Sequence, residues 1–177
     1  GIHLDGYADT CDALSSYGGR EKKLEILKDP HCGAFAVIRL CTYFLVYFCF
    51  AFCIRFSPRV GLCWTLALVL ERGLSGLAVA AFPMAKNTGL AHTFATAADR
   101  ESVKKILIVL SVLLAAALIA LGGGALVAAA LLVLWRYHHV AVKEFGGITG
   151  DLAGWFLQKA EFWMLAALAA SQWGGIL

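Results

Sequence analysis

Residues 106–135 read ILIVLSVLLAAALIALGGGALVAAALLVLW, an apolar run interrupted by the three glycines 122–124. One continuous helix over this run would be about 45 Å long, whereas the hydrocarbon core of a bilayer is about 30 Å thick. Glycine favours a tight turn between two shorter helices. The run therefore predicts two membrane-crossing helices, at about 104–121 and 124–141.

The composition on either side of this run indicates the same kind of protein. The sequence is 60% hydrophobic and 15% charged, whereas a soluble domain carries about 25% charged residues. Further apolar segments lie at 34–54, 60–82 and 152–172. We therefore expect an all-α, polytopic transmembrane helical bundle with about five spans, preceded by short amphipathic helices at about 1–18 and 20–29. We expect one membrane-embedded domain over residues 1–177, with 1–33 cytoplasmic and 34–172 forming the bundle.

The charged loops predict the orientation of this bundle. Five spans place residues 1–33, 83–105 and 136–151 on one side, and these hold ten of the fifteen Lys and Arg and ten of the twelve acids. The positive-inside rule makes that side cytoplasmic. The net charge of +3 and the lack of a basic run interleaved with aromatics argue against a nucleic-acid partner.

Three aspartates in the first helix form the main candidate site. Asp5, Asp9 and Asp12 have i, i+4, i+7 spacing, which places them within about 60° on one helix face. Their mutual repulsion is relieved by a divalent cation, and oxygen ligands without His or Cys suit Mg²⁺ bound together with a substrate's phosphates. The alternative is a solvated acidic face.

Two other polar stretches lie where spans begin. In KDPHCGAF, residues 28–35, Asp29 could complete a metal site and Lys28 or His31 could hold a phosphate. In GGITGDLAG, residues 146–154, Thr149 or Asp151 could cap the last helix. The functional alternative is that the glycines and the helix N-terminus meet a phosphate.

Charged residues also occur inside the expected spans, at Glu71, Arg72, Lys159 and Glu161. Such groups are costly in a bilayer and should face the bundle interior. They form either an interhelical pair, such as Arg72 with Glu161, or the lining of a pocket for an anionic substrate.

Taken together, GIHLDGYADTCD (1–12), KDPHCGAF (28–35) and GGITGD (146–151) resemble the signature blocks of the cobalamin synthase family, also called adenosylcobinamide-GDP ribazoletransferase. The blocks occur in family order. The resemblance implies a multi-pass enzyme of the cell inner membrane with its active site on the cytoplasmic side. It implies Mg²⁺-dependent joining of adenosylcobinamide-GDP to α-ribazole or α-ribazole 5′-phosphate with release of GMP.

Carried over residue by residue, the resemblance implies roles for ten residues: Asp5, Asp9 and Asp151 in catalysis; Asp5, Asp9, Asp12 and Asp29 in binding the metal; and His3, Lys28, Arg72, Gly147 and Thr149 in binding the substrates. The sequence departs from the family pattern at His31 and Lys86, where arginine is common. Because Gly1 falls inside the first block, we expect a fragment without its N-terminal part. A homo-oligomer is compatible with the family.

Two other classes compete with this interpretation. The CDP-alcohol phosphotransferases also begin with Asp-Gly, but their pattern continues with Ala-Arg where this sequence has Ala8-Asp9. A cation transporter would place its site near the midplane of internally repeated helices. Here most acids lie at one surface and no internal repeat is visible, which favours the enzyme.

Overall fold

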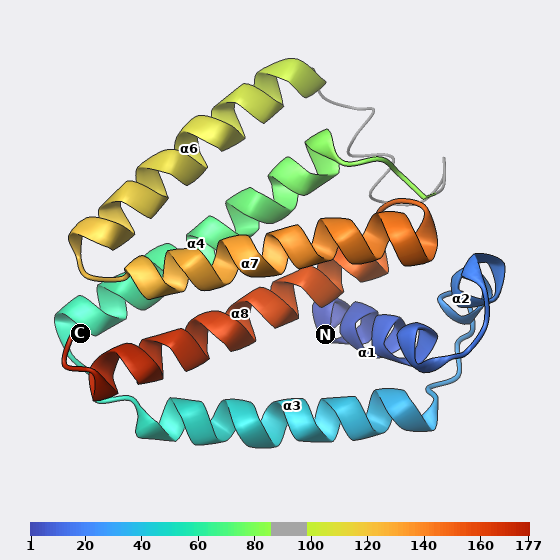
Figure 1. The fold of residues 1–177 in the computed structure, drawn as a ribbon, viewed down its shortest axis with the longest axis horizontal. Coiled ribbons are helices and arrows are strands. Elements are labelled where there is room, and N and C mark those ends of the chain that lie inside the picture. Colours follow the sequence, from blue (N-terminus) through green and yellow to red (C-terminus); the bar gives the residue numbers. More distant parts are fainter. Residues whose placement is uncertain (86–98) are drawn as a thin grey trace.

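The computed structural model describes residues 1–85 and 99–177, which are almost entirely helical (Figure 1). The elements are α1 (Ile2–Ser15), α2 (Arg20–Ile26), α3 (Ala34–Cys53), α4 (Pro58–Ala81), α6 (Arg100–Ala120), α7 (Gly124–Val140), the π-helical turn η1 (Ala141–Phe145) and α8 (Gly150–Trp173). Among these residues the only β pairing is an isolated bridge between Met84 and Ile148. The predicted all-α bundle is confirmed.

In the described part of the chain, four helices are long and apolar enough to cross a membrane: α3, α4, α6 and the helix formed by α7 with η1. The predicted break at the glycines is confirmed, because Gly122 has a φ of +87°, a conformation that residues with a side chain rarely adopt. The fifth predicted span, α8, has a suitable length of 24 residues. It is not among the four because Gln158, Lys159 and Glu161 lower its hydropathy, so its membrane crossing stays a prediction.

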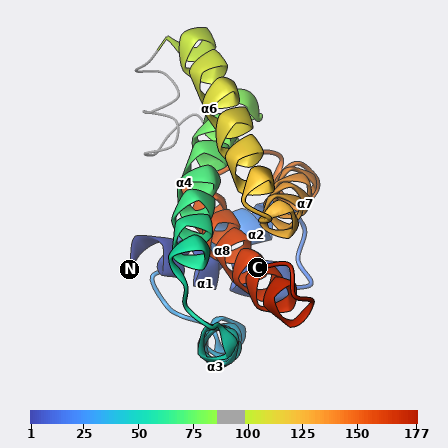
Figure 2. The ribbon, with the colours of Figure 1, turned by 90° about the vertical axis from the view of Figure 1, so that its left-hand side faces the viewer.

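Helix α8 lies at the centre of the bundle and contacts α1, α3, α4 and α7. Its Phe156, Met164 and Leu168 are almost completely buried. Figure 2 shows α6 and α3 at opposite edges, and each has only 11% of its most apolar window buried. The outer helices thus present apolar side chains outward, as lipid-facing helices do, whereas Gln158 of α8 is buried in the bundle.

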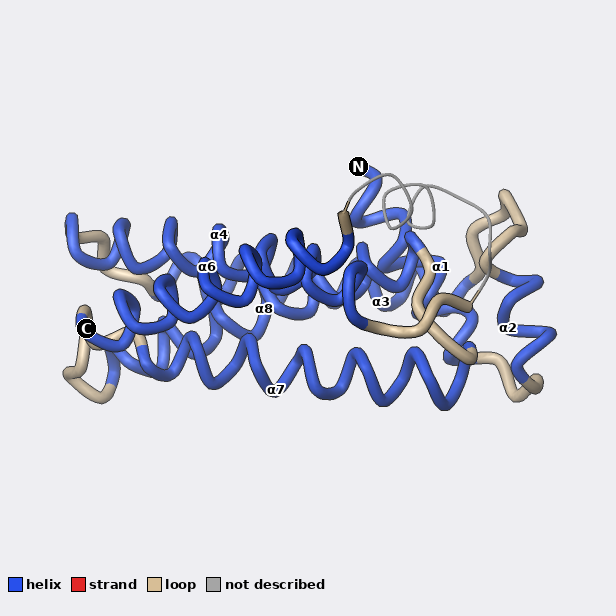
Figure 3. The backbone as a smooth tube through the Cα atoms, turned by 90° about the horizontal axis from the view of Figure 1, so that it is seen from above, coloured by secondary structure: helices blue, strands red, loops and turns tan. Residues whose placement is uncertain are grey.

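Helix α2, η1 and the start of α8 lie at the same end of the bundle (Figures 1 and 3). An ion pair between Lys23 and Glu144 joins α2 to η1. The strand-like bridge joins the end of α4 to the start of α8: Ile148 N donates to the carbonyl of Pro83 (2.8 Å), and Ala85 N donates to the carbonyl of Ile148 (3.0 Å). The connection that contains Lys86, residues 86–98, lies outside the described residues.

Thr149 is the N-cap of α8, because its Oγ1 accepts a hydrogen bond from Leu152 N at 3.2 Å. Removing this cap with Thr149→Ala is expected to destabilise the protein by about 1 kcal/mol. Thermal unfolding in detergent should show a lower midpoint for Thr149→Ala and an almost unchanged midpoint for Thr149→Ser, which retains the hydroxyl. An equal loss in both variants would show that the methyl group, and not the cap, carries the effect.

Candidate functional site

The site forms where α1 crosses the beginning of α8. A Cβ atom added to Gly6 would lie 2.7 Å from the carbonyl oxygen of Asp151, and one added to Gly154 would lie 3.0 Å from the carbonyl oxygen of His3. The two helices therefore meet backbone to backbone. This close approach places Asp151, which is remote in sequence, beside the aspartates of α1.

The electrostatics of Asp9 show that four acids share this region. The pKa of the Asp9 carboxyl is raised to about 6, first by burial and then by the negative charges of Asp5, Asp151 and Asp12, in that order of importance. Like charges disfavour the ionised form of a neighbour. The structure thus brings together the three predicted α1 aspartates and the predicted Asp151. This group is called the acidic cluster below.

Asp12 also contacts the beginning of α3. A Cβ atom added to Gly33, the N-cap of that helix, would collide with the Asp12 carboxylate, so a side chain at position 33 would displace it. A negative charge at a helix N-terminus is favourable because of the helix dipole. The absence of a side chain at Gly33 therefore leaves room for the Asp12 carboxylate. Besides α1 and α8, the beginning of α3 also borders the acidic cluster.

Asp29 and Lys28 lie beside α2, where they help to line a cavity of about 270 Å³. His31 donates its backbone N–H to Asp29 Oδ1 at 3.0 Å, and its Nδ1 lies 2.7 Å from the same oxygen. These contacts lower the pKa of Asp29. The charges that act on Asp29 are those of His31 and Lys22, and none of the α1 aspartates is among them. The structure does not bring Asp29 into the acidic cluster, so its role as a metal ligand stays a prediction, as does the role of Lys28.

His3 and Arg72 are brought near each other. Burial lowers the pKa of His3, and the charge of Arg72 lowers it further. The Arg72 side chain is 48% exposed, and its Nε lies 3.4 Å from Oε1 of Glu71. The pairing of Arg72 with Glu161 considered from the sequence is wrong, since Glu161 instead accepts a hydrogen bond from the hydroxyl of Tyr47 at 2.7 Å.

Gly147 and Thr149 have structural contacts in the loop before α8. Gly147 has a φ of +153°, and a Cβ atom there would lie 2.5 Å from the backbone nitrogen of Ala85. Thr149 caps α8, as the structural alternative predicted. The contacts of both residues with a phosphate stay predictions.

Within the described ranges, no group of three or more His, Cys, Asp or Glu side chains is arranged so as to hold a metal ion. The donor chemistry nevertheless fits a hard divalent cation, because the acidic cluster supplies only oxygens. After burial, repulsion by the other three carboxylates contributes to the raised pKa of Asp9, and such an ion would relieve that repulsion. The carboxylates would have to draw closer together around the ion.

Sequence reasoning missed the positioning roles of Gly33 and Gly154. Gly154 lies three residues after Asp151, one turn along the same helix, and the Cβ atom it lacks would also lie 3.5 Å from the Cα of Gly6. A small residue one turn beyond a candidate catalytic residue is the signal that could have indicated a helix crossing.

Comparison with known proteins supports the resemblance. The family model described as cobalamin-5-phosphate synthase matches residues 1–169. The adenosylcobinamide-GDP ribazoletransferase of Lachnoclostridium phytofermentans is 42% identical over 172 residues, which cover 96% of this chain and 64% of the relative. The enzyme of that name from Pseudomonas syringae pv. tomato is 33% identical over 171 residues, covering 96% and 69%. The chain thus spans about two thirds of the length of these relatives. No solved structure matches it.

Proposed function

Because this chain belongs to the cobalamin-5-phosphate synthase family, we propose that it carries the acidic active site of an adenosylcobinamide-GDP ribazoletransferase. The reaction joins adenosylcobinamide-GDP to α-ribazole or α-ribazole 5′-phosphate and releases GMP. One observation carries the proposal beyond family membership: Asp5, Asp9 and Asp12 of α1 act electrostatically together with Asp151 of α8. Grouped acids at the polar end of a membrane bundle suit chemistry on a diphosphate.

In the proposed mechanism, a ribose hydroxyl oxygen of the ribazole forms a bond to the phosphorus on the corrinoid side of the diphosphate. The bond from that phosphorus to the bridging oxygen breaks, and GMP leaves with the electron pair. Asp151 or Asp9 accepts the hydroxyl proton as general base. His3 and Arg72 hold phosphate oxygens beside the first turn of α1. Phosphoryl transfer depends mainly on such positioning and on charge neutralisation.

Asp5, Asp9 and Asp12 would hold Mg²⁺, with Asp29 as the further predicted ligand. The ion supplies the positive charge that neutralises the diphosphate oxygens. The alternative of a solvated acidic face does not account for the partial burial of Asp9 or for the neighbouring charge of Asp151 from α8.

We place the active site at the cytoplasmic face of the cell inner membrane. The four apolar helices indicate a multi-pass membrane protein. The acidic cluster lies at the end of the bundle where α2, η1 and the start of α8 gather (Figure 1). That end holds most of the Lys and Arg of the loops, which favours the cytoplasmic side.

The proposal is tested with full-length protein in membranes, given both substrates with and without Mg²⁺. GMP release and corrinoid product should appear only when both substrates and Mg²⁺ are present. Cation flux through liposomes without any release of GMP would instead indicate a transporter.

The pKa of Asp9 leads to a stability prediction for the metal-free protein. The folded-state pKa of about 6 lies above the ordinary value of 3.8, so the folded state binds the proton more tightly. The stabilisation from this group is present at low pH and is lost as the pH rises through about 6. In EDTA, the thermal midpoint should therefore fall between about pH 5 and pH 7.

Magnesium should reverse that fall, because it binds the ionised carboxylates. We expect added Mg²⁺ to raise the midpoint more at about pH 7 than at about pH 5. Asp9→Asn should flatten the metal-free pH dependence and weaken the response to Mg²⁺. If the thermal midpoint of the wild type changed neither with pH nor with added Mg²⁺, the acidic cluster would not be the metal site.

A further inference from the structure

A cavity of about 760 Å³ lies between α7 and α8. Apolar side chains such as Ala128 and Leu132 of α7 and Trp163 and Ala167 of α8 line most of it. Leu132 is 66% exposed and Trp163 is 51% exposed, so the cavity opens on the outside of the described bundle. On a membrane helix bundle, such an apolar opening faces lipid.

Two cations lie at one end of this cavity, Arg136 of α7 and Lys159 of α8. A third, Arg39 of α3, is close enough to repel Lys159. Within residues 1–85 and 99–177, none of the three takes part in an ion pair. The ammonium of Lys159 lies 5.6 Å from the ring centroid of Tyr7, a cation–π contact that brings no negative charge to it. Unpaired cations in a membrane bundle are costly and favour an anion.

This cationic end is separate from the acidic cluster. Tyr7, which Lys159 contacts, is about 200° around α1 from Asp5, so it lies on the opposite face of that helix. The charges that act on Asp9 are those of the other aspartates, and Lys159 is not among them. Helix α1 therefore stands between the acidic cluster and the three cations.

The cavity also has a defined depth. Arg136 lies nine residues before the end of η1, and Lys159 lies nine residues after the start of α8, so both are about 13 Å from the polar end of the bundle. From Arg136 the cavity continues along α7 to Ala125, about 16 Å further. The length of about 16 Å from Arg136 to Ala125 is about half of a hydrocarbon core of about 30 Å, so the apolar part of the cavity matches the depth of one leaflet.

We propose that this cavity binds an anionic phospholipid from the cytoplasmic leaflet. The lipid phosphate pairs with Arg136, Lys159 and Arg39, which snorkel toward the headgroup region, and an acyl chain lies along the apolar part of the cavity. The complementary charge selects an anion, and the apolar lining selects an amphiphile over free phosphate. In the described bundle the cavity lies on the outer side, where Leu132 and Trp163 are exposed.

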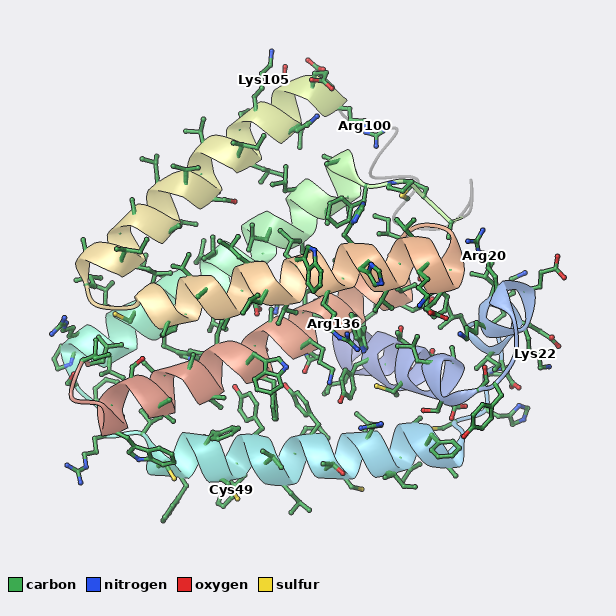
Figure 4. The ribbon with its side chains drawn as sticks, viewed as in Figure 1. Arg20, Lys22, Cys49, Arg100, Lys105 and Arg136 are labelled. Carbon is green, nitrogen blue, oxygen red and sulfur yellow. The ribbon has the colours of Figure 1, made fainter. Side chains whose placement is uncertain are left out.

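The test uses full-length protein in a mild detergent and native mass spectrometry with dioleoylphosphatidylglycerol or dioleoylphosphatidylcholine. The double variant Arg136→Gln/Lys159→Gln removes the cations, and Lys104→Gln/Lys105→Gln on α6 is the matched control. Figure 4 shows Lys105 at the far end of α6, well away from Arg136. At about 1 kcal/mol for each cation, binding of phosphatidylglycerol should weaken about 30-fold in the first variant and stay unchanged in the control. Ala128→Trp, which fills the cavity, should weaken binding of either lipid.

Four outcomes overturn the proposal. The two lipids could bind equally in the wild type, or the charge variant could retain phosphatidylglycerol as the wild type does. Inorganic phosphate or adenosylcobinamide-GDP could displace the lipid, which would make the cavity a site for free anions or for substrate. The spectra could instead show a dimer that is independent of lipid and lost in Ala128→Trp, which would make this face a contact between copies. Circular dichroism of each variant confirms that it remains folded.

Discussion

Asp9→Asn is expected to reduce Mg²⁺-dependent GMP release by at least about 10³-fold while leaving membrane insertion intact. The asparagine keeps the shape of the side chain but removes the charge that binds the metal. Metal neutralisation of a diphosphate contributes several kcal/mol to the transition state, and each 1.36 kcal/mol is tenfold in rate. Because Asp9 is partly buried beside three other acids, removing its charge also relieves repulsion, so the fold should not suffer.

Two companion variants make this experiment decisive. Asp5→Asn should cause a comparable loss, and the double variant Asp5→Asn/Asp9→Asn should lose little more than either alone, because residues that hold one metal act as a unit. Glu21→Gln on α2 removes one negative charge from the same end of the bundle outside the acidic cluster, and it should keep full activity. Undiminished turnover of either single aspartate variant would rule out the assignment.

The helices were largely predictable from the sequence because membrane spans have simple signatures. An apolar run longer than the bilayer must break, and the glycines at 122–124 determined where it did. Pro58 likewise lies in the first turn of α4, a position that suits its missing N–H. The exception is α8, whose buried polar residues make the central helix look less like a span than the peripheral ones.

The candidate site was only partly predictable, since half of it is local and half depends on tertiary contacts. The shared face of Asp5, Asp9 and Asp12 follows from helical periodicity alone. The position of Asp151 beside these aspartates depends on the crossing of α1 and α8 at Gly6 and Gly154. Helical periodicity does not reveal such a crossing. For Asp29, the sequence suggested a place in the metal site that the structure does not show. Its carboxylate instead contacts Nδ1 of the neighbouring His31 within the same loop.

The helix crossing leads to the second large expected effect, that of Gly6→Ala. The added Cβ atom would lie 2.7 Å from the carbonyl oxygen and 2.8 Å from the Cα of Asp151. These are backbone atoms that cannot rotate away, so α1 must move off α8. Overpacking of this kind costs about 1–3 kcal/mol, which thermal unfolding in detergent would record as a lower midpoint.

The same displacement should reduce GMP release per folded molecule by about 10²-fold, because it separates Asp5 and Asp9 from Asp151 and a misplacement of about 1 Å is enough for such a loss. Gly124→Ala is the matched control, since nothing lies within 4 Å of its added Cβ atom and it occupies the first turn of a different helix, α7. It should retain both stability and activity. If Gly6→Ala lost stability but kept its turnover per folded molecule, the α1 aspartates would be acting without Asp151. A loss of both stability and turnover is expected only if catalysis requires α1 and α8 to keep their position relative to each other.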